Sequence, residues 1–479
     1  MRQSLLVMFF LWSALPTHAQ VKQIKRIDGI SISTMAIDDL MKRLMDTAEV
    51  TGVCLGIIND NKPVYVKTYG FKDKEKGEKI DTATTFYAAS FSKSVFAFMV
   101  MHLVQEGKLD LDKPLYQYLP KPIPEYDNYR DLAGDDRWKL ITARHCLSHT
   151  TGFPNWRSLN PRDNKKLEIF FKPGARYAYS GEGLVLLQLV VETITGKTVE
   201  ALAKEKIFIP FNMPHTSYQW QPIHEKDFAL GYTVSGVALK RYNTRPINAA
   251  GSMETTIADY SRFISAVLQG KGLTPKAKQE MLSPQIPILT RRQFPSLNND
   301  TTSENKKVQL SYGLGWGLLR SPYGWAFFKE GHDDGWEHYN ISFPDKKTSI
   351  IIMTNSSNGE SIFKEMLEEI IGDTYTPWQW EGYAPYFSYV NVPANEINNY
   401  TGNYAMGDMQ GEISVQGGNL YIEVAKGGVA KQKLYLLPDG RFRMREFPVD
   451  IEFEKDGNGN VIKMIAWVDK EKNEFTRMK

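Results

Sequence analysis

The chain has 479 residues, of which 42% are hydrophobic and 24% are charged, a composition typical of folded globular proteins. Its 58 basic and 55 acidic residues leave a formal net charge of +3, so electrostatics give no reason to expect nucleic acid as a partner. A length well above the ~100–200 residues of one domain predicts at least two folded units.

The first 19 residues have the features of a secretory signal peptide. Arg2 supplies a positive start, residues 5–15 form an apolar stretch, and residues 17–19 form a small-x-small cleavage site before Gln20. The apolar stretch is shorter than the ~20 residues that span a bilayer. We therefore expect a secreted or periplasmic mature protein that begins at Gln20 and has no integral membrane segment. A buried N-terminal helix is the alternative interpretation.

Residues 20–375 are expected to form one α/β unit. A helix is predicted over 35–50 and strands over 52–59 and 64–69, and the region 90–310 is mostly helical. Strand patterns return at 325–329, 338–343 and 348–354, before a helix over 360–371. Strands on both sides of a helical middle predict an antiparallel sheet flanked by helices, with an all-helical lobe inserted.

The last part of the chain has a different pattern. Residues 376–393 are rich in Pro, Trp and Tyr without periodicity, which indicates a linker. Residues 394–479 contain short alternating runs divided by Gly and Asp turns, and predict a small barrel-like antiparallel β domain. The runs lie at 413–415, 420–424, 433–437, 442–445 and 451–453.

The stretch FYAASFSK at 86–93 carries a Ser and a Lys three residues apart, just before an apolar helix over 95–104. That spacing puts Ser90 and Lys93 on one face of the first helical turn. A Ser hydroxyl is a weak nucleophile and needs a base within hydrogen-bond reach. Lys93 can be that base only when neutral, and burial at an apolar helix start lowers the pKa of a lysine. A solvated Ser and Lys on a helix surface is the alternative interpretation.

Two further motifs favour the catalytic interpretation. The stretch KPGARYAYSG at 172–181 places Tyr179 after a Pro-Gly turn and before an apolar helix. A phenol there can pass protons between the nucleophile and the leaving group. The stretch GHDDG at 331–335 lies beside the returning strands, where a backbone N–H can join that of Ser90 in holding an oxyanion.

The order Ser90, Lys93, Tyr179 and His332 resembles the active-site elements of the serine β-lactamase/penicillin-binding-protein superfamily. More narrowly, the chain is similar to the class C β-lactamase-like branch, which includes esterases, D-amino-acid peptidases and acyltransferases. The C-terminal β domain resembles the lipocalin-like domain found on many members of this branch. The resemblance covers residues 35–372 and includes the framework stretches LITARHCLSHTTG (140–152), AAGSMETT (249–256) and YGLGWG (312–317).

The resemblance implies a role for each matching residue. Ser90 is acylated, Lys93 accepts its proton, and Tyr179 assists proton transfer to the leaving group. His332 stands where the family has Lys or His, and Gly335, three residues further on, supplies the second oxyanion N–H. No cofactor is implied. The implied partner is a small acyl donor, an ester or an amide that includes peptide-like ones, and an alcohol is an alternative acceptor.

Some residues depart from the family pattern. The second motif reads Tyr-x-Asn in the family, and Gly181 replaces the Asn that binds an acylamido group and steadies the Lys. Asp334 replaces a usual Gly beside Asp333, and two carboxylates there are expected to repel the carboxylate of a penicillin. His332, with an unperturbed pKa near ~6.5, holds an anion less well than Lys. We therefore expect a neutral or cationic acyl donor and inefficient β-lactam hydrolysis.

The remaining candidates have weaker patterns. Trp156 and Trp336 are candidates for the wall of the acyl pocket, with core packing as the alternative. Cys54 and Cys146 lie in apolar runs and are expected to be buried free thiols, although one disulfide is an alternative in an exported protein. No metal site is predicted.

Three functions remain open from the sequence. The first is a hydrolase, in which water releases the acyl group from Ser90. The second is an acyltransferase, in which an alcohol or amine accepts that group. The third is an inactive relative that binds a ligand. The intact Ser90, Lys93 and Tyr179 favour the two enzymes over the third alternative.

Overall fold

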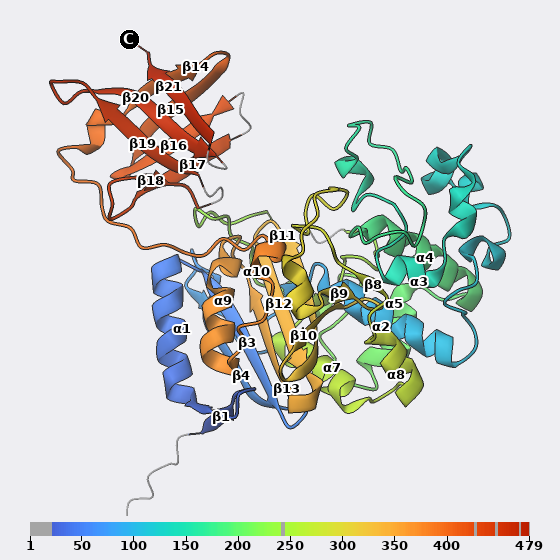
Figure 1. Cartoon of the computed structure of the whole chain (residues 1–479). Helices are drawn as coiled ribbons and strands as arrows, with labels where there is room; N and C mark the ends of the chain where they lie inside the picture. The colour runs from blue at the N-terminus through green and yellow to red at the C-terminus, as the bar shows by residue number, and fades with distance from the viewer. Residues whose placement is uncertain (1–21, 241–244, 426–428, 446–448, 469–470, 479) are drawn as a thin grey trace, which may run out of the picture.

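The computed structural model describes residues 22–240, 245–425, 429–445, 449–468 and 471–478, and the expected signal peptide lies outside these ranges. The described residues form an α/β unit with a helical lobe, and a C-terminal barrel joined to it by a linker (Figure 1). Among the described helices, none combines the length and hydropathy that a bilayer crossing requires.

A nine-stranded antiparallel sheet forms the centre of the α/β unit, in the order β5-β4-β3-β13-β12-β11-β10-β9-β8. The chain therefore enters the sheet at β3 and β4, leaves it for the helical lobe, and returns to pair β13 with β3. The strands are β3 (Gly52–Asn59), β4 (Lys62–Asp73), β5 (Glu78–Lys79), β8 (Ile286–Pro287), β9 (Ser311–Tyr312), β10 (Gly317–Ser321), β11 (Gly324–Asp333), β12 (Trp336–Phe343) and β13 (Thr348–Thr354).

The central strands are buried on both faces, which explains their continuous apolar sequences. Side chains alternate between the faces of a strand. In β3, Cys54 and Ile58 join the core beneath the helical lobe, whereas Val53, Leu55 and Ile57 join the core under the terminal helices. Cys54 and Cys146 are buried free thiols, as predicted.

Helices cover both faces of the sheet. In Figure 1, α1 and α9 lie against one face, and α2, α7 and α8 lie on the other, toward the helical lobe. The predicted helix over 360–371 is interrupted, because α9 is flanked by a 3-10 turn and a π turn. The helices are α1 (Thr34–Ala48), α2 (Phe91–Gln105), α3 (Ala143–Leu147), α4 (Gly181–Thr195), α5 (Val199–Ala203), α6 (Pro222–Lys226), α7 (Ile257–Gln269), α8 (Pro275–Met281), α9 (Phe363–Met366) and α10 (Trp378–Glu381).

Two short ladders complete the α/β unit. Strands β1 (Gln23–Lys25) and β2 (Ser31–Ser33) pair ahead of α1. Strands β6 (Phe86–Tyr87) and β7 (Glu254–Thr255) pair immediately before α2 and α7. The second ladder joins segments about 170 positions apart and so fixes the start of α2 to the far end of the helical lobe.

The C-terminal domain is a closed antiparallel barrel of eight strands, closed by the pairing of β14 with β21. Its interior is filled by side chains such as Tyr404, Leu420, Phe442 and Phe475. The strands are β14 (Gly402–Met406), β15 (Met409–Gln416), β16 (Asn419–Val424), β17 (Val429–Leu436), β18 (Phe442–Arg443), β19 (Asp450–Lys455), β20 (Val461–Val468) and β21 (Glu471–Arg477). The alternating runs had not predicted β14, β20 or β21.

Candidate active site

Ser90 lies at the turn that joins β6 to α2. It is the residue just before the helix and is only partly buried, whereas its neighbours are buried. The preceding residue, Ala89, has φ of 45°, a left-handed conformation that is strained for a residue with a side chain. Ala88 donates its N–H to Met253 O at 2.8 Å, which holds the turn against β7. The Ser90 hydroxyl is thus presented at the end of a buried helix on a fixed turn.

Lys93 is positioned as a base for Ser90. Its Nζ lies 2.9 Å from Ser90 Oγ and 2.6 Å from Ala250 O, and the side chain is 1% exposed. Burial, together with the nearby charge of Lys329, lowers the pKa of Lys93 well below its ordinary value. A neutral amine here can donate to Ala250 O while its lone pair accepts the Ser90 proton.

Tyr179 occupies the other side of the nucleophile, two residues before the first residue of α4. Its ring packs on His149 at 4.2 Å between centroids and is 2% exposed. Burial raises the pKa of Tyr179 to about 12, so the phenol keeps its proton near neutral pH. The phenol oxygen accepts a hydrogen bond from Lys329 Nζ at 3.1 Å and also hydrogen-bonds Ser90.

The cation beside Tyr179 is Lys329, and the expectation for His332 is wrong. Both residues lie on β11, but they are three residues apart and therefore point to opposite faces of the strand. Lys329 is completely buried, whereas the His332 side chain is 68% exposed and pairs with Glu337 at 2.6 Å. Glu337 raises the pKa of His332 to about 9, but this charge faces away from Tyr179.

The family's third motif therefore begins three residues earlier than expected, at Lys329 and not at His332. With Lys329 in the first position, the Gly that follows two residues later is Gly331 and not Asp334. A Cβ on Gly331 would lie 3.0 Å from Ala88 O, so a glycine lets β11 approach the nucleophile turn. The third residue after Lys329 is His332, whose backbone N–H replaces that of Gly335 as the candidate oxyanion donor.

Gly335 has a different role in the structure. Its N–H donates to Ser357 Oγ at 2.7 Å, and its φ of 83° lets the chain turn from β11 into β12. Among the described strands, residues 329–333 of β11 pair with β12 alone, because the ladder with β10 ends at Phe328. That unpaired edge is where an acyl substrate can align along the strand beside Ser90.

Trp156 explains why Gly181 replaces the family's Asn. A Cβ at position 181 would lie 2.5 Å from the Trp156 ring, so the indole occupies the space of the missing side chain. The ring lies 5.7 Å from Lys93 Nζ and therefore covers the amine. Arg157 forms a two-armed ion pair with the buried Glu182, at 2.9 and 2.8 Å, which holds Trp156 over Gly181.

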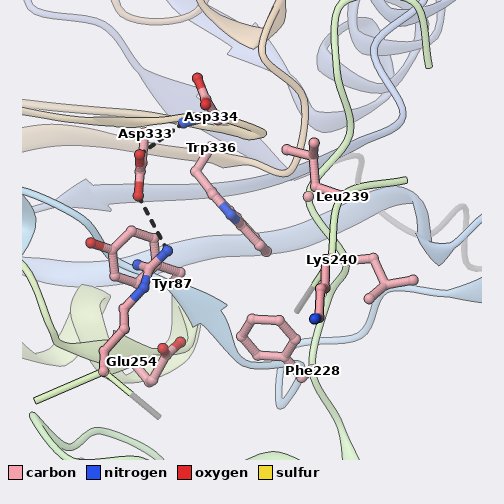
Figure 2. Close-up of a pocket in the computed structure, with 11 residues that line it drawn as sticks. Tyr87, Phe228, Leu239, Lys240, Glu254, Asp333, Asp334 and Trp336 are labelled. Atoms are coloured by element: carbon pink, nitrogen blue, oxygen red, sulfur yellow. Dashed lines mark hydrogen bonds and ion pairs between the residues drawn. The ribbon is translucent and has the colours of Figure 1, made fainter. Parts of the chain in front are cut away.

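A pocket of about 330 Å³ lies next to the nucleophile turn, and its wall includes Tyr87, three residues before Ser90. Figure 2 shows the rings of Tyr87, Phe228 and Trp336 around this pocket, with the carboxylates of Asp333 and Asp334 at one side. Asp333 pairs with Arg245 at 3.3 Å, and the guanidinium lies 3.6 Å from the centre of the Tyr87 ring. Trp336 thus lines this pocket, and its contact with an acyl group stays a prediction.

The structure brings together Ser90, Lys93, Tyr179 and Trp156, all of which were expected at the site. It adds Lys329 and its partner Glu330, whose carboxylate lies 2.7 Å from Lys329 Nζ. Although burial opposes its charge, Glu330 and Tyr179 raise the pKa of Lys329, which keeps it protonated. The spacing Lys-x-Gly at 329–331 was the sequence signal that could have identified this pair. In the described parts of the chain, no cluster of His, Cys, Asp and Glu has the arrangement of a metal site.

Comparisons with known proteins identify the family of the chain. The family model "Beta-lactamase" matches residues 37–371, well over half of the chain. Penicillin-binding protein 4* of Bacillus subtilis is 24% identical over 434 residues, covering 81% of this chain and 87% of that protein. Protein flp of Staphylococcus aureus is 23% identical over 340 residues, 67% of this chain, and the match spans only 63% of flp.

Solved structures show the same fold. An octameric penicillin-binding protein homologue from Pyrococcus abyssi covers 93% of the chain, and all of that protein matches, with a TM-score of 0.58 at 19% identity. A D-alanine carboxypeptidase AmpC from Burkholderia cenocepacia covers 67% of the chain and 95% of its own length, with a TM-score of 0.53 at 21% identity. The predicted β-lactamase-like fold with a C-terminal barrel is confirmed, and the chain belongs to the β-lactamase family, whose members are serine hydrolases and acyltransferases.

Proposed function

We propose that the protein is a serine hydrolase that cleaves an ester or amide through an acyl intermediate on Ser90. The observation that carries the proposal is the 2.9 Å contact between Ser90 Oγ and a fully buried lysine amine. The low pKa of Lys93, due to burial and to Lys329, leaves this amine neutral and able to accept a proton.

In the proposed acylation step, protons pass from Ser90 to Lys93 and from Tyr179 to the leaving group. The Ser90 proton moves to Lys93 Nζ as Oγ attacks the acyl carbon, and the resulting oxyanion is held by the backbone N–H groups of Ser90 and His332. The bond from the acyl carbon to the leaving oxygen or nitrogen then breaks. Tyr179 gives its proton to the leaving group and regains one from Lys93. The positive charge of Lys329 keeps the phenol oriented toward Ser90.

Deacylation repeats these steps with water in place of Ser90. Water gives a proton to Lys93 as its oxygen attacks the acyl carbon. The bond from the acyl carbon to Ser90 Oγ then breaks, and Lys93 returns the proton to Oγ. The pocket beside Tyr87 would take the acyl side chain, because its wall is partly aromatic and includes a residue three positions before Ser90.

The preference for a neutral or cationic acyl donor now depends on other residues. The expected weaknesses of His332 and Asp334 as third-motif residues do not apply, because Lys329 and Gly331 take those positions. Three carboxylates and two cations line the pocket, a formal excess of one negative charge that favours a neutral or cationic acyl group: Glu254, Asp333 and Asp334 against Lys240 and Arg245. Trp156 fills the place of the Asn that binds an acylamido group in the family, so we propose that simple esters react faster than a penicillin.

The test is the intact mass of the mature protein after brief exposure to activated acyl esters and to a penicillin. A mass gain that Ser90→Ala lacks is the expected result, and discharge by water alone identifies a hydrolase. Discharge only after an alcohol or amine is added would make the protein an acyltransferase. The proposal is overturned if no donor adds mass to Ser90, and the donor preference is overturned if penicillin turns over as fast as the esters.

Export remains part of the same proposal. Residues 1–19 carry the features of a signal peptide, so the acyl donor would be met outside the cytoplasm. N-terminal sequencing of the protein recovered from an exporting host is expected to begin at Gln20. An N-terminus that retains residues 1–19 would contradict it.

A further inference from the structure

The segment around Gln293, between β8 and β9, lies against the back of the candidate active site. The sequence contains no motif there, yet Gln293 is 3% exposed and Phe294 packs on Tyr179 at 5.6 Å between ring centres. The side-chain nitrogen of Gln293 donates to Glu330 Oε1 at 2.9 Å. The same oxygen accepts from Lys329 Nζ at 2.7 Å. Gln293 therefore touches no reacting group, but it contacts the carboxylate that pairs with Lys329.

The same glutamine is attached to the segment that leads to the barrel. Its backbone N–H donates to Trp380 O at 2.9 Å. The indole N–H of Trp380 donates to Thr290 Oγ1 at 3.2 Å, and Trp380 is 1% exposed. Trp380 belongs to α10, which follows the α/β unit and precedes the barrel. Two hydrogen bonds thus fix the Gln293 segment to the interdomain linker.

We infer that Gln293 is a positioning residue, which keeps Glu330 on Lys329, and that Trp380 of the interdomain linker keeps Gln293 in place. The inference depends on the proposed function, because it assigns Gln293 to the orientation of the charged group that holds Tyr179. The connection runs from Trp380 O through Gln293, Glu330 and Lys329 to the phenol.

The physical reason lies in the burial of Lys329. A buried ammonium loses its hydration and stays charged only while a counter-charge is in contact. The ionisable groups that face Lys329 come from several elements: Glu330 beside it on β11, Lys93 on α2, His149 after α3, Tyr179 before α4, and Glu381 on α10. Of these, the Glu330 carboxylate is the one within 2.7 Å, so the hydrogen bond that orients it affects Lys329 directly.

The first experiment is Gln293→Met, which keeps the volume of the side chain and removes the donor. The pH profile of kcat/KM for an activated ester is measured. We expect a loss of about tenfold, typical of a hydrogen bond to a charged group. We also expect the alkaline limb to move to lower pH by about one unit or more, since Lys329 loses its proton more easily without a fixed counter-charge. A merely structural role would change stability without moving that limb.

A double-mutant cycle tests whether Gln293 acts through Glu330. In a Glu330→Gln background, the Gln293→Met change is expected to alter kcat/KM by less than about twofold, because the carboxylate that it orients is gone. An equal loss in both backgrounds would overturn the inference.

The linker provides a matched pair of variants. Trp380→Phe removes the indole N–H that bonds Thr290, and it is expected to move the alkaline limb in the same direction as Gln293→Met. Trp378→Phe removes an indole N–H that has no hydrogen-bond partner among the described residues, and it is expected to leave the pH profile unchanged. Equal shifts in the two variants, or none in Trp380→Phe, would overturn the role of the linker.

Failure of the inference and failure of the proposed function are distinguishable. If the wild-type protein gains no acyl mass on Ser90, the proposed function fails. If the wild type is acylated and both Gln293→Met and Trp380→Phe keep its pH profile, only the positioning role fails.

Discussion

Lys93 has to satisfy two opposing demands within one side chain. It must be buried so that its amine is neutral, and it must keep enough polar contacts to remain hydrogen-bonded. The carbonyl of Ala250 and the hydroxyl of Ser90 supply these contacts, at 2.6 and 2.9 Å. The second lysine, Lys329, adds a positive charge that further opposes protonation of Lys93. Burial is thus the main cause of the lowered pKa of Lys93, and the charge of Lys329 adds to it.

The two candidate cations of the third motif can be separated by mutation. Lys329→Met is expected to lower kcat/KM by about a hundredfold, the lower range for loss of assisted proton transfer. Its acid limb should move to higher pH, because the pKa of Lys93 rises when the neighbouring charge is removed. His332→Gln keeps a donor for Glu337, and should change kcat/KM by less than about threefold, as at an exposed site. A larger loss of kcat/KM in His332→Gln than in Lys329→Met would show that the imidazole, and not Lys329, is the cation that acts in the reaction.

Gly181 offers a test of the role of Trp156. Gly181→Ala places a Cβ against the indole and is expected to destabilise the fold by about 1–3 kcal/mol, as overpacking does, and to lower the acylation rate. The double variant Gly181→Ala/Trp156→Ala removes the clash and should regain part of the lost stability. Thermal unfolding and acyl-mass kinetics measure the two effects. Strictly additive losses would show that the two residues do not share this space.

At the scale of elements, strand β11 determines the site. Its first half pairs with β10 on one side, and its second half leaves that edge open beside the nucleophile turn. Gly331 sits where the edge passes Ala88. The helix α2 meets this edge with its first turn, so the side chains of two elements reach one point although neither element contains the whole site.

We expect Gly331→Ala to separate these two elements. The added Cβ would lie 3.0 Å from Ala88 O and 3.1 Å from His338, so β11 must move away from the turn. The expected result is a kcat reduced about tenfold or more, since small displacements of catalytic groups have large effects. Gly411→Ala, at a strand glycine whose added Cβ meets only ordinary contacts of 3.5 Å or more, is the control. Equal kcat values for both variants would contradict the role of Gly331.

At the scale of the whole molecule, Glu49 joins the α/β unit to the barrel. The residue follows α1 and forms an ion pair with Arg445 at 2.7 Å. It also accepts hydrogen bonds from Tyr389 of the linker at 2.6 Å and from Tyr435 of β17 at 3.4 Å. Burial would raise its pKa, but Tyr389 and Arg445 bring the pKa of Glu49 below its usual value of 4.5.

That lowered pKa predicts how the docking of the barrel depends on pH. The ionised carboxylate stabilises the contact above the usual pKa, and this contribution is lost as pH falls through the lower folded value. Cleavage of the linker by an acid-active protease should therefore accelerate as the pH falls below about 4.5. Glu49→Gln should be cleaved fast already just above pH 4.5, where the wild-type carboxylate is still ionised, whereas Glu474→Gln, at an ion-paired residue of β21, should behave as wild type. Equal cleavage rates for all three proteins would contradict a role of Glu49 in holding the barrel against the α/β unit.

The sequence by itself determined the features that depend on neighbouring residues. The spacing of Ser90 and Lys93 puts them on one helical turn wherever that helix packs. The apolar runs of β3 and β13 predict strands buried on both faces, and the structure has them with the predicted bounds. The Pro-Gly turn and the apolar helix α4 likewise placed Tyr179 just ahead of that helix.

Tertiary structure decided between Lys329 and His332, which lie three residues apart on one strand, because the Lys-x-Gly spacing at 329–331 is only a short local signal. Alternation puts them on opposite faces, and the sequence does not state which face meets Tyr179. The same holds for Gln293, which is linked to Glu330 only because separate segments meet. Strand β21 was missed because its sequence is largely polar, and its pairing with β14 closes the barrel. Local spacing fixes which side chains share an element, and long-range packing fixes which of them become neighbours.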